Sequence, residues 1–358
     1  MARTFPCSQC GAEVEFDPAA AAPRCRWCGA VLAPPVAAAP PEELELAAWL
    51  ARAAAEAATV ERLAVRCGRC GAESSSEPNV TATRCPFCGS AVVAAAASRR
   101  LIRPAALLPF AVDAGRAQET FRRWLAGLWF APSALKRMAH RVGALVGVYV
   151  PFWTFDAATT STYEGERGDD VTVHEPVTVV EAGRRVTRSR AVTRTRWSGV
   201  SGTVSRRFDD VLVPASTSLP DGLVDGLQPW DLGALVPYDD AYLAGFRAES
   251  YSVALPAGFE RAKSAMAVTI REDVARDIGG DHQRVHRVET RHDDVTFKHV
   301  LLPVWLAAYR FRDRTFRFVV NARTGEVQGE RPWSWVKISL AVLVGLAVLL
   351  LVFSLAGR

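Results

Sequence analysis

Four Cys-x2-Cys pairs within the first 90 residues constrain this chain more than any other feature of its sequence. The set made of Cys7, Cys10, Cys25 and Cys28 recurs 60 positions later as Cys67, Cys70, Cys85 and Cys88. A glycine follows the second cysteine of every pair, where a tight turn favours a residue that adopts positive φ. The spacing therefore predicts two small units, each presenting four sulfur ligands.

Four thiolates in a tetrahedron are the ligand set of a structural Zn²⁺ site. Both sets lack a spare ligand or an open position, which favours a structural role over a catalytic one. Disulfides and redox-active pairs are the alternatives. The sequence disfavours them, because no apolar signal segment precedes Cys7 and disulfides are rare in the cytosol. We therefore expect two structural Zn²⁺ ions, and each ion supplies folding energy that a unit of about 25 residues cannot obtain from its own core.

The charge of the chain gives no support to a nucleic-acid partner. The formal charge is +5 with neutral thiols. Eight thiolates around two Zn²⁺ ions add about −4, which leaves about +1. A nearly neutral chain has no long-range attraction for phosphates.

The chain divides into five predicted parts. They are zinc ribbon 1 (1–33), a Pro/Ala linker and helix (34–65), zinc ribbon 2 (66–94), an α+β domain (100–332) and a C-terminal helix (336–355). Asp113 is the expected N-cap of one helix in the α+β domain, and a second helix is expected from Phe259 to Ile278. Val171–Glu181 and Val186–Trp197 are expected to form a hairpin. The predicted fold class is multidomain α+β.

Two segments of the α+β domain resemble each other. Residues 148–153 read Val-Tyr-Val-Pro-Phe-Trp, and residues 300–305 read Val-Leu-Leu-Pro-Val-Trp. The match suggests an internally duplicated domain. If so, Trp153 and Trp305 occupy related environments.

The C-terminal segment from Ile338 to Leu355 has no charge and no proline. With Val336 it is long enough to span a ~30 Å hydrocarbon core, and Trp333 and Trp335 stand where an aromatic belt is expected. We predict a single transmembrane helix over 336–355, with the N-terminal bulk in the cytoplasm of a tail-anchored cell-membrane protein. A buried core helix is the alternative.

Several segments together resemble bacterial zinc-ribbon membrane proteins of unknown function. They are the two C-x2-C-G units, RPAALLPF…GLWFAPSALK (103–136), YVPFWTFD (149–156), FKHVLLPVWLAA (297–308) and NARTGEVQGERP (321–332). Such chains carry names such as primosomal protein N′ (replication factor Y) or TFIIB-type zinc ribbon protein. The resemblance implies a family and no established activity.

Catalytic motifs are missing from the sequence. A P-loop needs G-x4-G-K-[ST], and none of the four lysines follows a glycine. There is no G-x-S-x-G, and Pro176 interrupts the one His-Glu pair. His282 and His286 are expected on a strand, where residues i and i+4 lie roughly 13 Å apart, too far for one metal. We therefore expect no enzyme, no nucleotide and no cofactor-binding residues.

Two main functions remain, with an enzyme in the α+β domain as a weaker third that no residue constellation recommends, and the sequence specifies neither the partner nor the oligomeric state. The first is a non-enzymatic adaptor that binds a protein partner. The second is a nucleic-acid-binding protein linked to replication or transcription, through arginines near the cysteines (Arg24, Arg26, Arg66, Arg69, Arg84) and through one face of the predicted hairpin. The arginines of that face are Arg188, Arg190, Arg194 and Arg196. A solvated face offset by Glu175 and Glu181 is the alternative explanation for the hairpin arginines.

Overall fold

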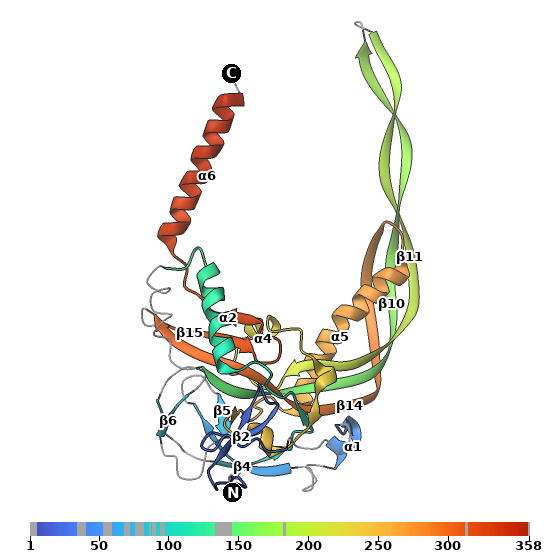
Figure 1. The fold of residues 1–358 in the computed structure, drawn as a ribbon. Coiled ribbons are helices and arrows are strands. Elements are labelled where there is room, and N and C mark those ends of the chain that lie inside the picture. The colour runs from blue at the N-terminus through green and yellow to red at the C-terminus, as the bar shows by residue number, and fades with distance from the viewer. Residues whose placement is uncertain are drawn as a thin grey trace.

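A computed structural model gives the fold of the chain. It describes residues 6–33, 41–52, 59–67, 72–75, 82–85, 87, 91–93, 97–132, 145–181, 184–311 and 314–356. Most of this part is one large β-sheet with few helices (Figure 1). The predicted α+β class is therefore wrong. The two strands of the expected hairpin, Val171–Glu181 and Val186–Trp197, are parts of the much longer strands Val146–Glu181 and Arg184–Pro214.

The described elements are as follows. The helices are α1 (Leu46–Ala51), α2 (Ala114–Gly127), α4 (Asp221–Asp225), α5 (Leu255–Ile278) and α6 (Trp335–Ala356), with the 3-10 helices η3 (Leu232–Ala234) and η4 (Asp240–Leu243). The strands before α2 are β1 (Val14–Asp17), β2 (Ala22–Cys25), β3 (Leu44–Glu45), β4 (Thr59–Arg66), β5 (Glu73–Ser75), β6 (Ala82–Arg84), β7 (Ala91–Val93), β8 (Ala97–Ile102) and β9 (Ala106–Leu107). The later strands are β10 (Val146–Glu181), β11 (Arg184–Pro214), β12 (Val236–Pro237), β13 (Arg247–Ala248), β14 (His282–Phe311), β15 (Arg314–Asn321) and β16 (Val327–Gly329).

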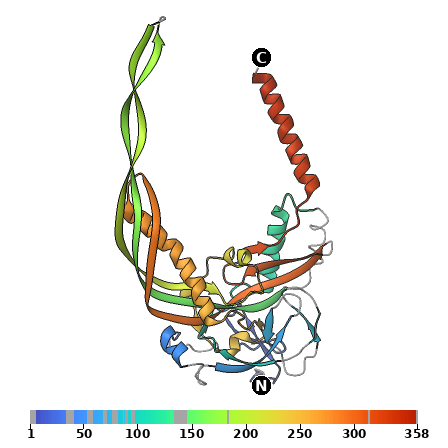
Figure 2. The ribbon, with the colours of Figure 1, turned by 180° about the vertical axis from the view of Figure 1, so that it is seen from behind.

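Three long antiparallel strands, β11, β10 and β14, form one side of the main sheet, whose order is β11-β10-β14-β15-β16. Strands β10 and β11 make one hairpin that pairs from Phe152↔Pro214 to Glu181↔Arg184. Strand β14 accompanies β10 only as far as Gly168↔His282. Beyond that pair the hairpin leaves the body as two strands (Figure 2).

Asp-Asp pairs explain why these strands are longer than the sequence predicts. Such pairs are expected in turns at strand ends. Instead, Asp210 and Asp294 lie inside β11 and β14 with φ of 51°. Both lie at the register shifts around Asp156, where a β-bulge absorbs a residue and the strand continues.

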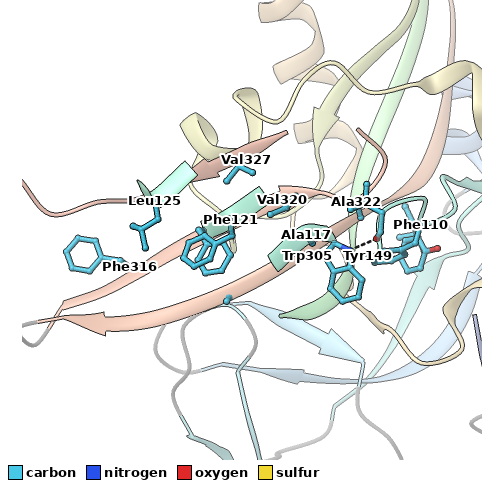
Figure 3. Close-up of a cluster of buried hydrophobic side chains, with 14 of the residues drawn as sticks. Phe110, Ala117, Phe121, Leu125, Tyr149, Trp305, Phe316, Val320, Ala322 and Val327 are labelled. Carbon is cyan, nitrogen blue, oxygen red and sulfur yellow. Dashed lines mark hydrogen bonds between the residues drawn. The ribbon is translucent and has the colours of Figure 1, made fainter. Parts of the chain in front are cut away.

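The two similar segments occupy equivalent positions. Trp153 Nε1 donates a 3.0 Å hydrogen bond to the Val253 carbonyl, and Trp305 Nε1 donates a 2.7 Å bond to the Val112 carbonyl (Figure 3). Each acceptor lies two residues before a helix, α5 in the first case and α2 in the second. The tryptophans therefore have matching environments, as internal duplication predicts.

Backbone hydrogen bonds near the two tryptophans also match between the two halves. The amides of Ser252 and Val253 donate to the Ala215 carbonyl, and the Ala215 amide donates to Pro151. In the other half, Ala111 and Val112 donate to Ala322, which donates to Pro303. Short parallel strands add a further match, since β13 pairs with β10 and β9 pairs with β14.

Helix α5 covers one face of the long strands. Its buried positions recur every four residues as the sequence predicts, at Ala262, Met266, Ile270, Val274 and Ile278. They pack in one cluster with Phe155 and Tyr163 of β10. Helix α2, N-capped by Asp113 as expected, places Phe121 against Phe318 in the equivalent cluster of the other half (Figure 3).

The C-terminal helix α6 extends away from the body (Figure 1). In the part of the chain that the structure describes, no helix has both the length and the apolar character needed to cross a membrane. This finding overturns the predicted transmembrane helix over 336–355 and the single-pass localisation at the cell membrane.

Candidate metal centre

Two matching turns place the first four cysteines. The Cys7 amide donates to the Ala12 carbonyl at 2.7 Å, and the Cys25 amide donates to Ala30 at 2.8 Å. The glycine after each pair, Gly11 or Gly29, closes its turn with φ of 75°. Strands β1 and β2 pair antiparallel between the two turns, with Val14 opposite Cys25. The two turns and the β1–β2 pairing thus bring the sulfur atoms of both Cys-x2-Cys pairs together.

The four sulfur atoms of Cys7, Cys10, Cys25 and Cys28 all lie within 4.8 Å of one another. Cys7 Sγ lies 3.6 Å from Cys28 Sγ, and Cys10 Sγ lies 3.5 Å from Cys25 Sγ. A disulfide requires about 2.05 Å, so these are free thiols. Four cysteines this close can hold a metal ion. Among the described residues, no other group of three or more His, Cys, Asp or Glu side chains has this geometry.

Backbone amides stabilise negative charge on the two buried sulfurs. Amide hydrogen bonds from Gln9 and Cys10 lower the pKa of Cys7. Amide hydrogen bonds from Cys28 and Trp27 lower the pKa of Cys25 to about 6, against the opposing effect of desolvation. Metal ligation needs thiolates, which the amides favour at these two positions, whereas hydrogen bonding to the Cys25 sulfur raises the pKa of Cys10 and desolvation raises that of Cys28.

The first cysteine unit rests on the main body through β1. The Phe16 amide donates to the Ala244 carbonyl at 3.0 Å, and the Phe16 ring lies 5.2 Å from that of Tyr242. A pocket of about 670 Å³ lies beside this contact, with Phe246 and Trp305 among its apolar lining residues. Its charged lining is mostly paired internally, as Arg24 with Asp17 and Arg26 with Glu15.

Two of the second four cysteines are described, and Cys70 and Cys88 lie outside the described residues. The Cys67 amide donates to the Ala72 carbonyl at 2.8 Å, which is the bond from Cys7 to Ala12 shifted by 60 positions. Cys67 and Cys85 are buried in one cluster with Phe87 and with β10 and β14 residues such as Val148. The first unit instead has a small cluster of its own around Val14. The two cysteine sets therefore differ in how they join the body.

The other sequence candidates form no metal site. His282 and His286 lie on β14, as expected for a strand. His282 Nε2 is 3.3 Å from Asp170, and His286 Nε2 is 3.7 Å from Glu166.

The arginines near the cysteines were candidates for nucleic-acid binding. Arg24 and Arg26 are ion-paired. Arg69 lies outside the described residues, as do the side chains of Arg66 and Arg84. The predicted domain boundaries stay predictions.

Sequence reasoning missed a charged cluster where the segment before α1 meets the sheet. Lys298 is 7% exposed, and its Nζ lies 2.8 Å from Glu43 and 2.7 Å from Asp210. Burial alone lowers a lysine pKa, but hydrogen bonds with Asp210 and Glu43 raise the Lys298 pKa instead. A lysine inside the apolar run Val295–Ala307 was the available signal, because an amine in a core strand needs a carboxylate partner.

The comparisons with known proteins are sparse. No family model matches this chain, and no solved structure matches it significantly. The uncharacterized protein YdjG of Bacillus subtilis (strain 168) is 28% identical over 262 residues, which covers 70% of this chain and 70% of YdjG. The primosomal and TFIIB-type names stay predictions. This chain is therefore similar to YdjG over most of its length, a likeness that brings no activity with it.

Proposed function

We propose that this chain is a non-enzymatic binding protein, an adaptor whose N-terminal cysteines hold structural Zn²⁺ ions. The four-sulfur cluster carries the proposal. With Zn–S bonds of about 2.3 Å, sulfurs at the corners of a tetrahedron are about 3.8 Å apart. The distances of 3.6 Å and 3.5 Å from Cys7 to Cys28 and from Cys10 to Cys25 fit that figure. The all-sulfur donor set favours Zn²⁺ over Mg²⁺ or Ca²⁺.

Two ions per chain are part of the proposal. The repeated bond from Cys67 to Ala72 supports a second turn of the same kind as that of Cys7. Four protein ligands leave a zinc ion no position for water or substrate, so each ion would stabilise structure and not catalyse a reaction. The binding role follows from a stabilised N-terminal unit and from a sequence without catalytic motifs.

Elemental analysis of the purified full-length chain tests the proposal. We expect two zinc ions per chain, one lost in Cys25→Ser and the other in Cys85→Ser. Co²⁺ exchanged into the protein should give the absorption of a tetrahedral thiolate site that added azide leaves unchanged, because no coordination position is open. Zinc-free protein, or a spectrum that azide shifts, would contradict the structural assignment.

A further inference from the structure

The outer part of the β10–β11 hairpin is an arm that the body does not need. We call residues 169–196 the distal hairpin. No third strand pairs with its described residues, since β14 begins at His282, opposite Gly168. In the other half of the duplicated body, β14 and β15 close their hairpin after the short run from Val304↔Asn321 to Phe311↔Arg314. The same packing is therefore achieved without an arm, and an isolated two-stranded hairpin gains little stability of its own.

One face of the distal hairpin carries its arginines. The register places Arg188 opposite Val177, Arg190 opposite Glu175 and Arg194 opposite Val171. Because side chains alternate along a strand, these residues share a face. We call this the basic face, and its members are Arg188, Arg190, Val192, Arg194, Arg196, Asp169, Val171, Val173, Glu175 and Val177. The opposite face consists mainly of threonine, serine and alanine.

The basic face continues the side of the sheet that α5 covers. On that side Arg206 Nη2 bonds to Asp273 of α5 at 2.7 Å, and Tyr163 bonds to Asp277 at 2.6 Å. The last turn of α5, which ends at Ile278, lies over Tyr163 of β10. The helix therefore does not extend over the distal hairpin. Val173 is 39% exposed, and all four arginines are exposed. A mixed apolar and cationic face thus lies open along the arm.

The charge of this face is positive. Its two carboxylates already have arginine partners, Asp169 with Arg167 at 2.9 Å and Glu175 with Arg194. With Arg167 counted, five arginines face two carboxylates, a net charge of +3. Glu181, the second carboxylate of the solvated-face alternative, is opposite Arg184 in the register, so that pair leaves the net charge of the face unchanged. A polyanion is the complementary partner.

The two-stranded form of the arm favours one polyanion. Thirteen residue pairs, from Asp169↔Arg196 to Glu181↔Arg184, make an arm of about 43 Å at about 3.3 Å per pair, long enough to follow one turn of B-form DNA. The arm twists about itself (Figures 1 and 2), and the DNA major groove admits a two-stranded β-ribbon. A-form RNA has a major groove too narrow for side chains to read. The described side chains of the arm include no Phe, Tyr or Trp on which single-stranded bases stack.

We propose that the basic face of the distal hairpin binds double-stranded DNA. Arg188, Arg190, Arg194 and Arg196 contact phosphates and groove edges, and the valine rows between them pack against the groove wall. The surface lies apart from the cysteine cluster, so the proposal stands independently of the zinc assignment.

Salt-dependent binding tests the proposal. The probe is a fluorescent 20-bp DNA duplex, titrated at ~50 to ~200 mM salt with the full-length chain in non-ionic detergent, which covers the apolar side chains of α6. The test variant is R188Q/R190Q/R194Q/R196Q. The matched control, R116Q/R122Q/R261Q/R271Q, removes the same charge from exposed arginines of α2 and α5.

We expect the test variant to reduce the slope of log affinity against log salt by about 3.6, which is 0.9 for each of four phosphate contacts. The control should bind as the unaltered chain does. No binding at ~50 mM salt, equal losses in both variants, or equal affinity for single strands would overturn the proposal. So would an arginine-dependent affinity for polyglutamate or anionic vesicles in place of DNA. Zinc content measured on the same samples shows separately whether the metal assignment holds.

Discussion

At the scale of single residues, the buried indoles of Trp153 and Trp305 make equivalent hydrogen bonds in the two similar halves of the body. Trp153 and Trp305 lie in different hydrophobic clusters, and each donates to a carbonyl just before a helix. The sequence predicted the relation from two similar segments. It did not predict which helix each tryptophan meets: Trp153 of β10 bonds to the segment before α5, and Trp305 of β14 bonds to the segment before α2.

Replacing each tryptophan by phenylalanine tests that relation. Trp153→Phe and Trp305→Phe each leave a buried carbonyl without its indole donor, which should lower the free energy of unfolding by about 1–3 kcal/mol. The double variant should show the sum within ~0.5 kcal/mol, because the sites share no partner. Urea unfolding followed by near-UV circular dichroism measures this. Trp27→Phe, at an indole 86% exposed, is the control and should change little.

A single ion pair between α5 and β11 predicts a dependence on pH. The hydrogen bonds from Arg206 lower the pKa of Asp273 from 3.8 to about 2. A depressed carboxyl pKa contributes stability above the unfolded pKa and loses it as pH falls through the folded pKa. The stability advantage of the native chain over Asp273→Asn should therefore be complete above pH ~4 and decline toward pH ~2. Urea midpoints of both proteins across this range decide it, and a constant difference would rule out the ion pair as its cause.

At the scale of elements, the sequence was informative about periodicity and poor about length. The four-residue repeat of α5 and the N-cap of α2 were readable because both are local. The long strands were not, since Asp210 and Asp294 look like turn residues until a neighbouring strand shows them to be bulges. The convergence of the first four cysteines was readable from spacing alone. The burial of Cys67 and Cys85 against β10 and β14 depends on long-range packing that no local pattern encodes.

The contact of α5 with the sheet requires a glycine. A Cβ built on Gly258 would lie 2.6 Å from Cδ1 of Trp153. Gly→Ala inside a helix ordinarily stabilises by about 1 kcal/mol. Gly258→Ala should instead destabilise by about 1–3 kcal/mol, because the buried indole cannot move away. Gly127→Ala in α2 meets no atom within 4 Å and is the matched control. Thermal unfolding of both variants measures the contrast, and a stabilised Gly258→Ala protein would show that α5 does not pack as described.

The distal hairpin should be removable. Asp170 and Thr195 are directly paired, so a two-residue Asn-Gly turn can join them after deletion of 171–194. The deleted residues belong to none of the buried clusters of the described chain. The melting temperature should therefore change by less than about 3 °C, equivalent to roughly 1 kcal/mol. Duplex DNA binding should be lost. A fall of ~10 °C or more would mean that the arm supports the body.

At the scale of the whole molecule, the two cysteine sets form a peripheral unit and an integrated one. The first has its own small cluster and meets the body through Phe16. The second contributes Cys67, Cys85 and Phe87 to the cluster that also contains Val148 and Leu302 of the central strands. The same Cys-x2-Cys motif thus occurs in a unit with its own small cluster and in a unit that is part of the main core.

Substituting one cysteine of each set distinguishes these roles, given the two zinc ions that we propose. Cys25→Ser should release one zinc ion and leave the main thermal transition within about 2 °C, since few body residues pack on that unit. Cys67→Ser should release the other ion and lower the same transition by at least about 5 °C, because a polar hydroxyl and a collapsed turn would disturb the core against β10 and β14. Zinc analysis and tryptophan fluorescence melting on the same samples provide both readings. Tryptophan reports on the body, where Trp153 and Trp305 are buried. If both variants melt alike after each loses one ion, the second set is as peripheral as the first, and its burial beside the central strands has no energetic weight.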